Sequence, residues 1–296
     1  MAKINIGIIG LGYIAKIHLT HLLKFRQVNV QSIFSRRDKS SEISPAIQFY
    51  SNYQKMIDKE KLDAVLICTP THTHKEITCK CAESGLDIFL EKPMALNPRE
   101  CDEILDSVRK NKVKLLVGQV LRFWATYGSI RRILSDNRSH FGKALSFEGK
   151  RLGTFPWSKW FADQKKSGGV ILDLSIHDID YANWLFSEPI SVRCNANRIS
   201  KFGKKVYGES FTEIEFNKKQ KAYCEASWAK PPEFEFYTGA KIATEEEEIE
   251  FDGTSIYKDG GIKVENIFPS DDGYYNQMHH FIEVITGEHT EFSINP

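Results

Sequence analysis

The sequence lacks an imbalance of charge. Its 296 residues include 40 Lys and Arg against 39 Asp and Glu, which gives a formal net charge of +1. A balance this close gives no electrostatic reason to expect nucleic acid or an anionic membrane as a partner. Apolar runs stay short of the ~20 residues that cross a bilayer, and the apolar start has no signal-peptide cleavage region. We therefore expect a cytoplasmic protein.

Regularly spaced cysteines are also lacking. The six cysteines follow no repeated interval, which favours reduced thiols over a disulfide framework. Cys79 and Cys81 stand too close for a zinc knuckle, and the pair His72 and His74 has no third ligand nearby. We expect no metal site.

The length suits two domains.

The first 120 residues alternate between short β-branched apolar runs and helical patterns. Continuous apolar strands separated by helices predict a parallel sheet covered on both faces, as in a doubly wound α/β Rossmann fold. Asn97 and Pro98 are expected to begin one of the helices. The expected strands are Ile4–Ile9, Val28–Phe34, Asp63–Cys68, Leu86–Leu90 and Lys114–Val117, and the expected helices are Tyr13–Lys24, Thr73–Ser84 and Asn97–Lys110.

After about residue 120, apolar residues alternate with polar ones instead. Alternation predicts strands with one buried face, hence an α+β second domain with a large, mostly antiparallel open sheet. We place the domains at residues 1–121 and 122–296. The uncovered face of such a sheet would join copies into a homodimer or homotetramer. The expected strands are Ala144–Arg151, Thr212–Phe216, Ala222–Trp228, Glu248–Phe251 and Ile262–Ile267, with helices at Val170–Phe186 and Tyr275–Ile285.

The segment from Gly10 to Ala15 has the pattern of a dinucleotide-binding turn, because it follows a predicted strand and opens a predicted helix. Gly10 permits the tight turn, Gly12 lets a pyrophosphate approach the backbone, and the small Ala15 lets the helix pack on the strand. The phosphates would lie on N–H groups at the positive end of the helix, near Tyr13 and Ile14. The alternative is a glycine turn without a ligand.

The second strand ends without the acidic residue that would hold the ribose 2′-hydroxyl of NAD. In its place stand Ser35, Arg36, Arg37 and Lys39. A hydroxyl and three cations suit a 2′-phosphate, which arginine can bind with two hydrogen bonds. The segment therefore predicts a preference for NADP. The alternatives are a basic surface loop, or Arg36 stacked on the adenine of either cofactor.

Two places offer groups for hydride chemistry, in which an acid or base must move the hydroxyl proton. Glu91-Lys92-Pro93 follows the fourth strand, at the end where parallel sheets gather ligands, although alone it would also suit a surface loop. Asp173 and His177 are four apart in a predicted helix and share a face, so the carboxylate can hold the imidazole. The alternative for them is a pair on a helix surface.

Together these segments resemble the glucose–fructose oxidoreductase / inositol dehydrogenase / MocA family. The shared motifs match in order and separation across nearly the whole chain. They are Gly10-x-Gly12-x-x-Ala15, Thr69-Pro70-x-x-x-His74, Glu91-Lys92-Pro93 and Gly168-Gly169-x-x-x-Asp173-x-x-x-His177.

The resemblance implies NAD(P)-dependent redox chemistry on a sugar, cyclitol or nucleotide-linked sugar. It implies Lys92 and His177 at the reacting centre, with His177 as acid/base and Asp173 supporting it or binding substrate hydroxyls. It further implies a cofactor groove lined by Thr69, Pro70, Thr71, His74, Glu91, Lys92 and Gln119, and a substrate bordered by Arg122 and Trp160.

The resemblance also implies a last helix that packs back on the nucleotide-binding domain. No further helical pattern follows the expected helix at Tyr275–Ile285, which we assign to the second domain. The sequence therefore predicts that the outer edge of the nucleotide-binding domain lacks this cover.

We therefore expect an NADP-preferring dehydrogenase or ketone reductase acting on a carbohydrate-like small molecule. A second hypothesis is a non-catalytic NADP-binding sensor, but a sensor has no need of Lys92, Asp173 and His177 together. A bile-pigment reductase of the same architecture is a third hypothesis. It is less favoured, because Lys92, Asp173 and His177 suit an alcohol substrate better.

Overall fold

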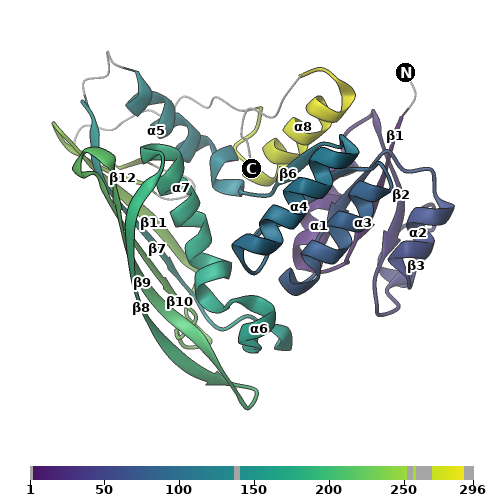
Figure 1. The fold of residues 1–296 in the computed structure, drawn as a ribbon, viewed down its shortest axis with the longest axis horizontal. Helices are drawn as coiled ribbons and strands as arrows, with labels where there is room; N and C mark the ends of the chain where they lie inside the picture. The colour runs from purple at the N-terminus through teal and green to yellow at the C-terminus, as the bar shows by residue number, and fades with distance from the viewer. Residues whose placement is uncertain (1–2, 137–140, 252–255, 258–268, 290–296) are drawn as a thin grey trace. The chain divides into compact units, whose positions relative to one another are not determined.

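The computed structural model describes residues 3–136, 141–251, 256–257 and 269–289. The chain divides into two compact units (Figure 1). The first comprises Met1–Gly118 with the segment from Gln277 onward, and the second comprises Gln119–Asn276. This division differs from the expected 1–121 and 122–296 mainly in the C-terminal segment, which groups with the first unit.

The first unit is built on a six-stranded sheet in the order β3-β2-β1-β4-β5-β6, and all neighbours are parallel. This is the order of a dinucleotide-binding Rossmann sheet, so the predicted fold class is confirmed. The edge strand β3 is absent from the predicted elements because none of its three residues is buried. The strands are β1 (Ile4–Ile9), β2 (Val28–Phe34), β3 (Gln48–Tyr50), β4 (Ala64–Ile67), β5 (Asp87–Leu90) and β6 (Leu115–Val117).

Helices cover both faces of this sheet. Helices α3 and α4 pack on the face that carries Leu90, in a core cluster with Ile77 and Ile104. His18 of α1 contacts the ring of Phe89, which alternation along β5 places on the opposite face. The helices are α1 (Tyr13–Leu22), α2 (Tyr53–Lys59), α3 (His74–Glu83) and α4 (Pro98–Asn111), with 3₁₀ turns at Ser40–Glu42 and Thr71–Thr73.

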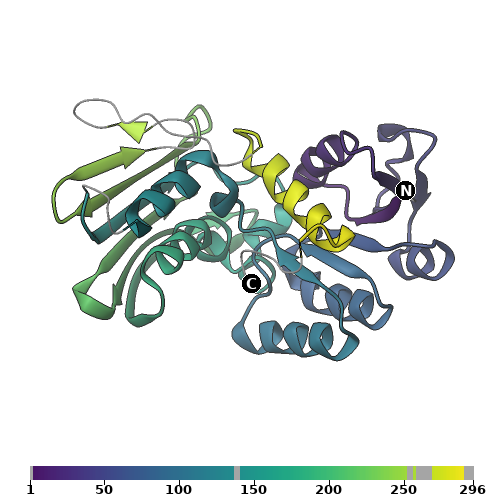
Figure 2. The same cartoon turned by 90° about the horizontal axis from the view of Figure 1, so that it is seen from above.

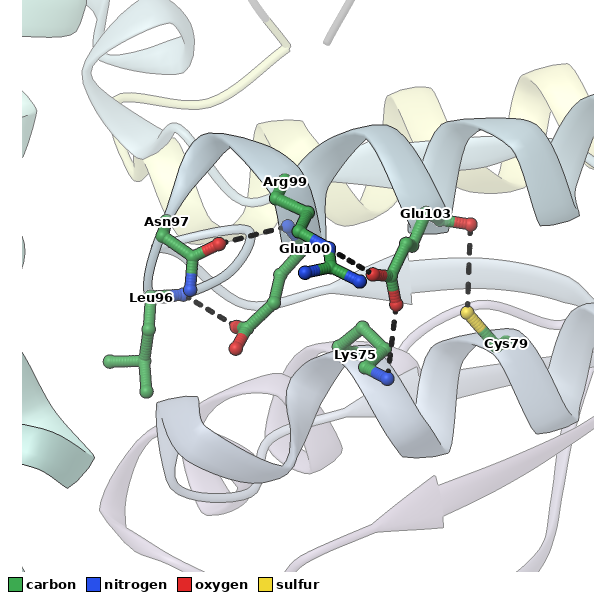
Figure 3. A network of polar contacts seen from close by, with 7 residues as sticks. All are labelled: Lys75, Cys79, Leu96, Asn97, Arg99, Glu100 and Glu103. Carbon is green, nitrogen blue, oxygen red and sulfur yellow. Dashed lines mark hydrogen bonds and ion pairs between the residues drawn. The ribbon is translucent and has the colours of Figure 1, made fainter.

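Helix α4 begins where the sequence predicts. The side chain of Asn97 accepts a hydrogen bond from the backbone N–H of Glu100 at 3.1 Å (Figure 3). Glu100 accepts in turn from the backbone N–H of Leu96 at 3.1 Å. The two bonds therefore satisfy one backbone donor in the first turn of α4 and one just before the helix. An ion pair of 3.1 Å between Lys75 and Glu103 joins α4 to α3.

The last described helix, α8 (Gly273–Thr286), packs on the first unit from Gln277 onward (Figure 2). The ring of Phe281 contacts that of Phe89 at 5.8 Å between centroids. Lys114 donates to the carbonyl oxygen of Val284 at 2.5 Å. The expectation that the outer edge of this unit lacks the cover of a last helix is therefore wrong, because the buried apolar residues of α8 pack there.

The second unit contains a seven-stranded sheet in the order β13-β12-β11-β7-β10-β9-β8. Strands β7 and β10 pair in parallel and the other neighbours are antiparallel, so the mostly antiparallel sheet is confirmed. Strand β8 is missing from the predicted set because it has no buried residue. The expected strand Ile262–Ile267 lies outside the described residues. The strands are β7 (Ala144–Leu152), β8 (Pro189–Lys201), β9 (Lys204–Phe216), β10 (Lys221–Ser227), β11 (Tyr237–Thr244), β12 (Glu248–Phe251) and β13 (Ile256–Tyr257).

Helices α5 and α7 lie on one face of this sheet (Figure 1). Their buried residues, among them Ile130 and Tyr181, share a core cluster with Phe147, Ile214 and Cys224 of the strands. The helical segments are α5 (Ala125–Ser135), α6 (Gln164–Ser167) and α7 (Ile176–Phe186), with 3₁₀ turns at Val120–Phe123, Lys159–Ala162 and Asn217–Lys219 and a π-helical turn at Ile171–Ser175. In the described part of the chain, none of the helices has both the length and the apolar character needed to cross a membrane.

A buried ion pair joins the second sheet to α7. Arg151 of β7 donates from Nε and Nη2 to one oxygen of Asp178, at 3.2 and 3.1 Å. A Cβ at Gly149 would lie 2.6 Å from Asp178 Cγ, so glycine makes room for the carboxylate. Burial raises the pKa of Asp178, and Arg151 opposes this rise. Removing one partner would leave an uncompensated buried charge.

Replacing Arg151 by Met is expected to lower the free energy of unfolding by about 3–5 kcal/mol, because Asp178 then loses its countercharge. Urea denaturation followed by circular dichroism measures this loss. The matched control is the double variant Arg151→Met/Asp178→Asn, which removes the charge as well and should recover part of the stability. If the Arg151→Met variant is as stable as the wild type, Arg151 is not the countercharge that stabilises buried Asp178.

Candidate active site

The turn after β1 has the geometry of a phosphate-binding turn. Gly10 has a φ of +102°, and a Cβ there would lie 2.8 Å from the carbonyl oxygen of Cys68. Glycine alone meets both conditions without strain. Gly12 is the N-cap residue of α1, and apart from Gly12 and its two chain neighbours no described residue has a heavy atom within 4 Å of where its Cβ would be. Ala15 is fully buried, as a small residue against the strand should be.

These features fit the pyrophosphate of a dinucleotide. The first N–H groups of α1, including those of Tyr13 and Ile14, have no acceptor within the helix. Within the described residues no side chain caps them. The open space beside Gly12 gives a ligand access to these donors, and the positive end of the helix favours an anion.

The loop after β2 carries the four residues predicted for the adenosine end of the cofactor. Ser35 is buried at the strand end, whereas Arg36 and Arg37 are exposed. The ammonium of Lys39 donates to the carbonyl oxygen of Leu11 at 2.8 Å. Lys39 therefore ties this loop to the glycine turn, and the two arginines are the more accessible cations.

Asp38 is an acidic residue in the same loop that is absent from the predicted cofactor residues. Its carboxylate accepts from the backbone N–H and the hydroxyl of Ser40, at 2.9 and 2.7 Å. The backbone donor is the larger cause of the lowered pKa of Asp38. The carboxylate thus stays ionised and is oriented by its own turn.

His74 joins the loop after β4 to the loop after β5. Its Nδ1 lies 2.8 Å from the carbonyl oxygen of Pro93, and its Nε2 lies 2.8 Å from that of Thr69. Burial lowers the pKa of His74, and the two carbonyl oxygens oppose this. Thr71 is also buried, whereas Pro70 is half-buried. With only 1% of its surface exposed, His74 supports these loops from inside the unit.

Glu91 connects the Lys92 segment to α1. His18 Nε2 donates to Glu91 Oε1 at 2.6 Å, and both side chains are buried. The other carboxylate oxygen, Oε2, accepts from the backbone N–H of Lys92 at 3.2 Å, and the Lys92–Pro93 bond is cis. Sequence reasoning missed His18. The available signal is a histidine three residues after Ala15, on the side of the helix that packs on the sheet.

Asp173 and His177 lie in the π-helical turn and at the start of α7, and both are half-buried. Gly168 and Gly169 precede them with φ values of +72°. A Cβ on Gly169 would lie 2.8 Å from the carbonyl oxygen of Tyr207, so this approach needs glycine. In a turn closed by i to i+5 bonds, four residues still amount to about one turn. Asp173 and His177 therefore follow one another along one side of the helical segment.

Two contacts anchor this helical segment within the second unit. The hydroxyls of Ser175 and Ser210 are 2.9 Å apart and buried. Arg122 donates to both oxygens of Asp180, at 2.8 and 2.6 Å, and its guanidinium lies over the ring of Trp184. The predicted contact of Arg122 with substrate stays a prediction, because the arginine is already held by this ion pair.

Two other predicted residues, Gln119 and Trp160, differ in their surroundings. The buried Oε1 of Gln119 has no hydrogen-bond partner among the described residues. A buried acceptor left unpaired is costly, so a ligand that donates a hydrogen bond would stabilise it. Trp160 stacks on Phe161 with ring centroids 3.9 Å apart, and Phe161 packs edge-on against Trp228.

Each unit thus carries part of what hydride chemistry requires. The first has a turn with the geometry of a phosphate site and a lysine whose backbone N–H is bound by Glu91. The second has a carboxylate and an imidazole on one helical segment, which are groups of the kind that serve as general acid and base.

Two family models match the chain. The model described as "Oxidoreductase family, NAD-binding Rossmann fold" matches residues 4–119, and the model of the "GFO/IDH/MocA C-terminal domain" matches residues 127–255. The resemblance drawn from the motifs is therefore confirmed.

Curated relatives include dehydrogenases of inositols. Myo-inositol 2-dehydrogenase of Thermotoga maritima is 28% identical over 190 residues, which cover 63% of this chain and 56% of the relative. The scyllo-inositol 2-dehydrogenase (NAD(+)) of Bacillus subtilis is 32% identical over 182 residues, covering 60% and 52%. The matched stretch thus spans just over half the length of each relative.

Solved structures share the fold along nearly the whole chain. A putative myo-inositol dehydrogenase from Sinorhizobium meliloti has a TM-score of 0.81 at 22% identity, covering 98% of this chain and 92% of that one. The WlbA dehydrogenase from Chromobacterium violaceum, in complex with NADH and UDP-GlcNAcA, has a TM-score of 0.84 at 19% identity, covering 98% and 88%. On the evidence of both family models, the chain belongs to the Gfo/Idh/MocA oxidoreductase family.

Proposed function

We propose that this protein transfers a hydride between a nicotinamide dinucleotide and a hydroxyl or keto group of a sugar, cyclitol or nucleotide-linked sugar. The observation that carries the proposal is the open N-terminus of α1 beside Gly12, in the unit that also presents Lys92. The inositol dehydrogenases among its relatives, and the nucleotide sugar named with the Chromobacterium structure, support a polyhydroxylated substrate.

In the proposed reaction, the nicotinamide supplies the hydride acceptor or donor. His177 takes the hydroxyl proton during oxidation and returns it during reduction. The ammonium of Lys92 stabilises the negative charge that develops on the substrate oxygen. Asp173 holds the imidazole or binds substrate hydroxyls, while Arg122 and Trp160 border the substrate.

Replacing Lys92 by Met or His177 by Ala is expected to lower kcat/KM by about 10²- to 10⁴-fold, because each change removes a group that acts on the substrate oxygen or its proton. The measurement is the absorbance of reduced nicotinamide with a panel of sugars, cyclitols and nucleotide sugars. The dissociation constant of the cofactor, from fluorescence titration, should change little. Lys110→Met, an exposed lysine on α4, is the matched control.

Near-normal kcat/KM in the variant of Lys92 or of His177 would remove the role proposed for that residue. Cofactor binding by the wild type without turnover on any member of the panel would favour the non-catalytic sensor instead. The two outcomes are separate, because the first concerns a residue and the second the whole activity.

We further propose that NADP is preferred over NAD. The exposed Arg36 and Arg37, directly after the buried Ser35, are the groups available to a 2′-phosphate. Lys39 contributes by holding this loop on the glycine turn through Leu11. One similar structure is named as a putative NADPH-dependent oxidoreductase, and NAD or NADH is named with others.

Replacing Arg36 or Arg37 by Ala is expected to raise the dissociation constant for NADP about tenfold or more and to leave that for NAD nearly unchanged, because a charged hydrogen bond to the 2′-phosphate is lost. The measurement is fluorescence titration with both cofactors. Arg26→Ala serves as the control, since Arg26 is exposed and precedes β2 at its opposite end. A wild-type kcat/KM that clearly favours NAD would contradict the preference.

We also propose that the protein is cytoplasmic, in keeping with six free cysteines, and that copies associate through the second sheet. Helices α5 and α7 cover one of its faces. The opposite face presents Phe211, 46% exposed, stacked on Tyr223 with 6.3 Å between ring centroids. Exposed stacked aromatics between strands suit burial against a second copy.

Replacing Phe211 by Lys is expected to shift the protein toward monomer, because the like charges of two copies would then meet at the proposed interface. Light scattering after size-exclusion chromatography gives the molar mass. Phe202→Lys, at an exposed position in the turn between β8 and β9, is the control. A wild-type protein that is monomeric in solution would contradict the proposed interface.

A further inference from the structure

We propose that His18 is a positioning residue for Lys92 and acts through Glu91. The inference rests on the proposed function, in which Lys92 acts on the substrate oxygen. It adds a residue that lies on a different element, α1, and that touches neither substrate nor reacting atoms in this role. We call the three residues His18, Glu91 and Lys92 the clamp.

The clamp follows from the alternation of side chains along β5 and the residue after it. Leu90 faces the core cluster under α3 and α4. Its neighbours Phe89 and Glu91 therefore face the other side of the sheet, where α1 lies. The rings of His18 and Phe89 form a T-shaped pair with 5.1 Å between centroids, and His18 Nε2 lies 2.6 Å from Glu91 Oε1, so two neighbours fix the orientation of the imidazole.

The buried carboxylate of Glu91 is held on both oxygens. His18 Nε2 donates to Oε1, and the backbone N–H of Lys92 donates to Oε2 at 3.2 Å. The side chain of His18 is fully buried and that of Glu91 is 8% exposed, so little water competes for these bonds. A Cβ at Gly118 would lie 3.3 Å from Oε1, so glycine at the neighbouring strand end leaves room for the carboxylate.

The clamp links the two parts of the first unit that the proposed reaction uses. Helix α1 begins at Gly12, in the turn that fits the pyrophosphate, and His18 lies in the second turn of the same helix. Because Glu91 binds both His18 and the backbone N–H of Lys92, it fixes the backbone of Lys92 relative to α1. Each carboxylate oxygen has further acceptor capacity, so the clamp leaves room for the cofactor contact expected of Glu91.

The first test measures hydrogen exchange in the protein without cofactor or substrate. We expect His18→Leu to speed exchange of the Lys92 amide, read in a peptide covering residues 89–95, because Glu91 loses its anchor and releases the Lys92 N–H. His18→Gln should keep the slow exchange, because its amide N–H stands near the place of Nε2. His18→Asn should not, because its amide is one carbon shorter.

The matched control is His21→Leu, which removes the other buried histidine of α1. It should leave the exchange of the Lys92 amide unchanged. If His18→Leu and His21→Leu alter exchange equally, the effect belongs to the stability of α1 and the proposal is overturned. Should His18→Leu fail to fold, the comparison of His18→Gln with His18→Asn decides in the same way.

The second test separates positioning from binding. With a substrate that the wild type turns over, we expect His18→Leu and His18→Asn to lower kcat about 10- to 100-fold, as small misplacements of reacting groups do. The cofactor dissociation constant should change less than threefold, and His18→Gln should restore most of kcat. Faster exchange with an unchanged kcat overturns the proposal and leaves the proposed function intact. A wild type without turnover overturns the function, while the exchange test still decides whether the clamp exists.

Discussion

Parallel pairing of β1 with β4 and of β4 with β5 is the constraint on which the first unit depends. Because the strands run in one direction, the loops at their carboxyl ends share one edge of the sheet. Each loop is then joined to the next. Gly10 lies close against Cys68, His74 contacts the carbonyl oxygens of Thr69 and Pro93, and the Lys92 segment is tied to α1 through Glu91. The glycine turn and Lys92 are thereby connected within one unit.

In the second unit, buried ion pairs hold helix α7, which carries His177, in place. Arg151 holds Asp178, and Arg122 holds Asp180, so helix α7, which begins at Ile176, is fixed at two points near its start. Burial alone would raise the pKa of both carboxylates, and each arginine opposes that rise. Such pairs add little net stability, since desolvation offsets the attraction. The two ion pairs instead fix the direction of the helix axis and the rotation of the helix about that axis.

Local chemistry explains which features the sequence predicts well. The glycine turn and the Asn97 cap depend on neighbours within a few residues, and the continuous apolar strands depend on burial on both faces. The bond between His18 and Glu91 joins residues 73 apart in the chain, and the contact of Lys39 with Leu11 depends on how a loop folds back. Strand β8 escapes prediction because its residues are exposed. The packing of α8 on the first unit is likewise a tertiary outcome, since amphipathic spacing does not name the partner.

The central claim is hydride transfer between a substrate carbon and a nicotinamide. Its most direct test uses an inositol or sugar deuterated at the carbon that carries the reacting hydroxyl. The protein is incubated with this substrate and oxidised cofactor, and the reduced cofactor is analysed by mass spectrometry. We expect one deuterium on the nicotinamide ring, transferred from the substrate carbon. Reduced cofactor without the label, or no reduced cofactor with any of the deuterated polyols, would contradict it.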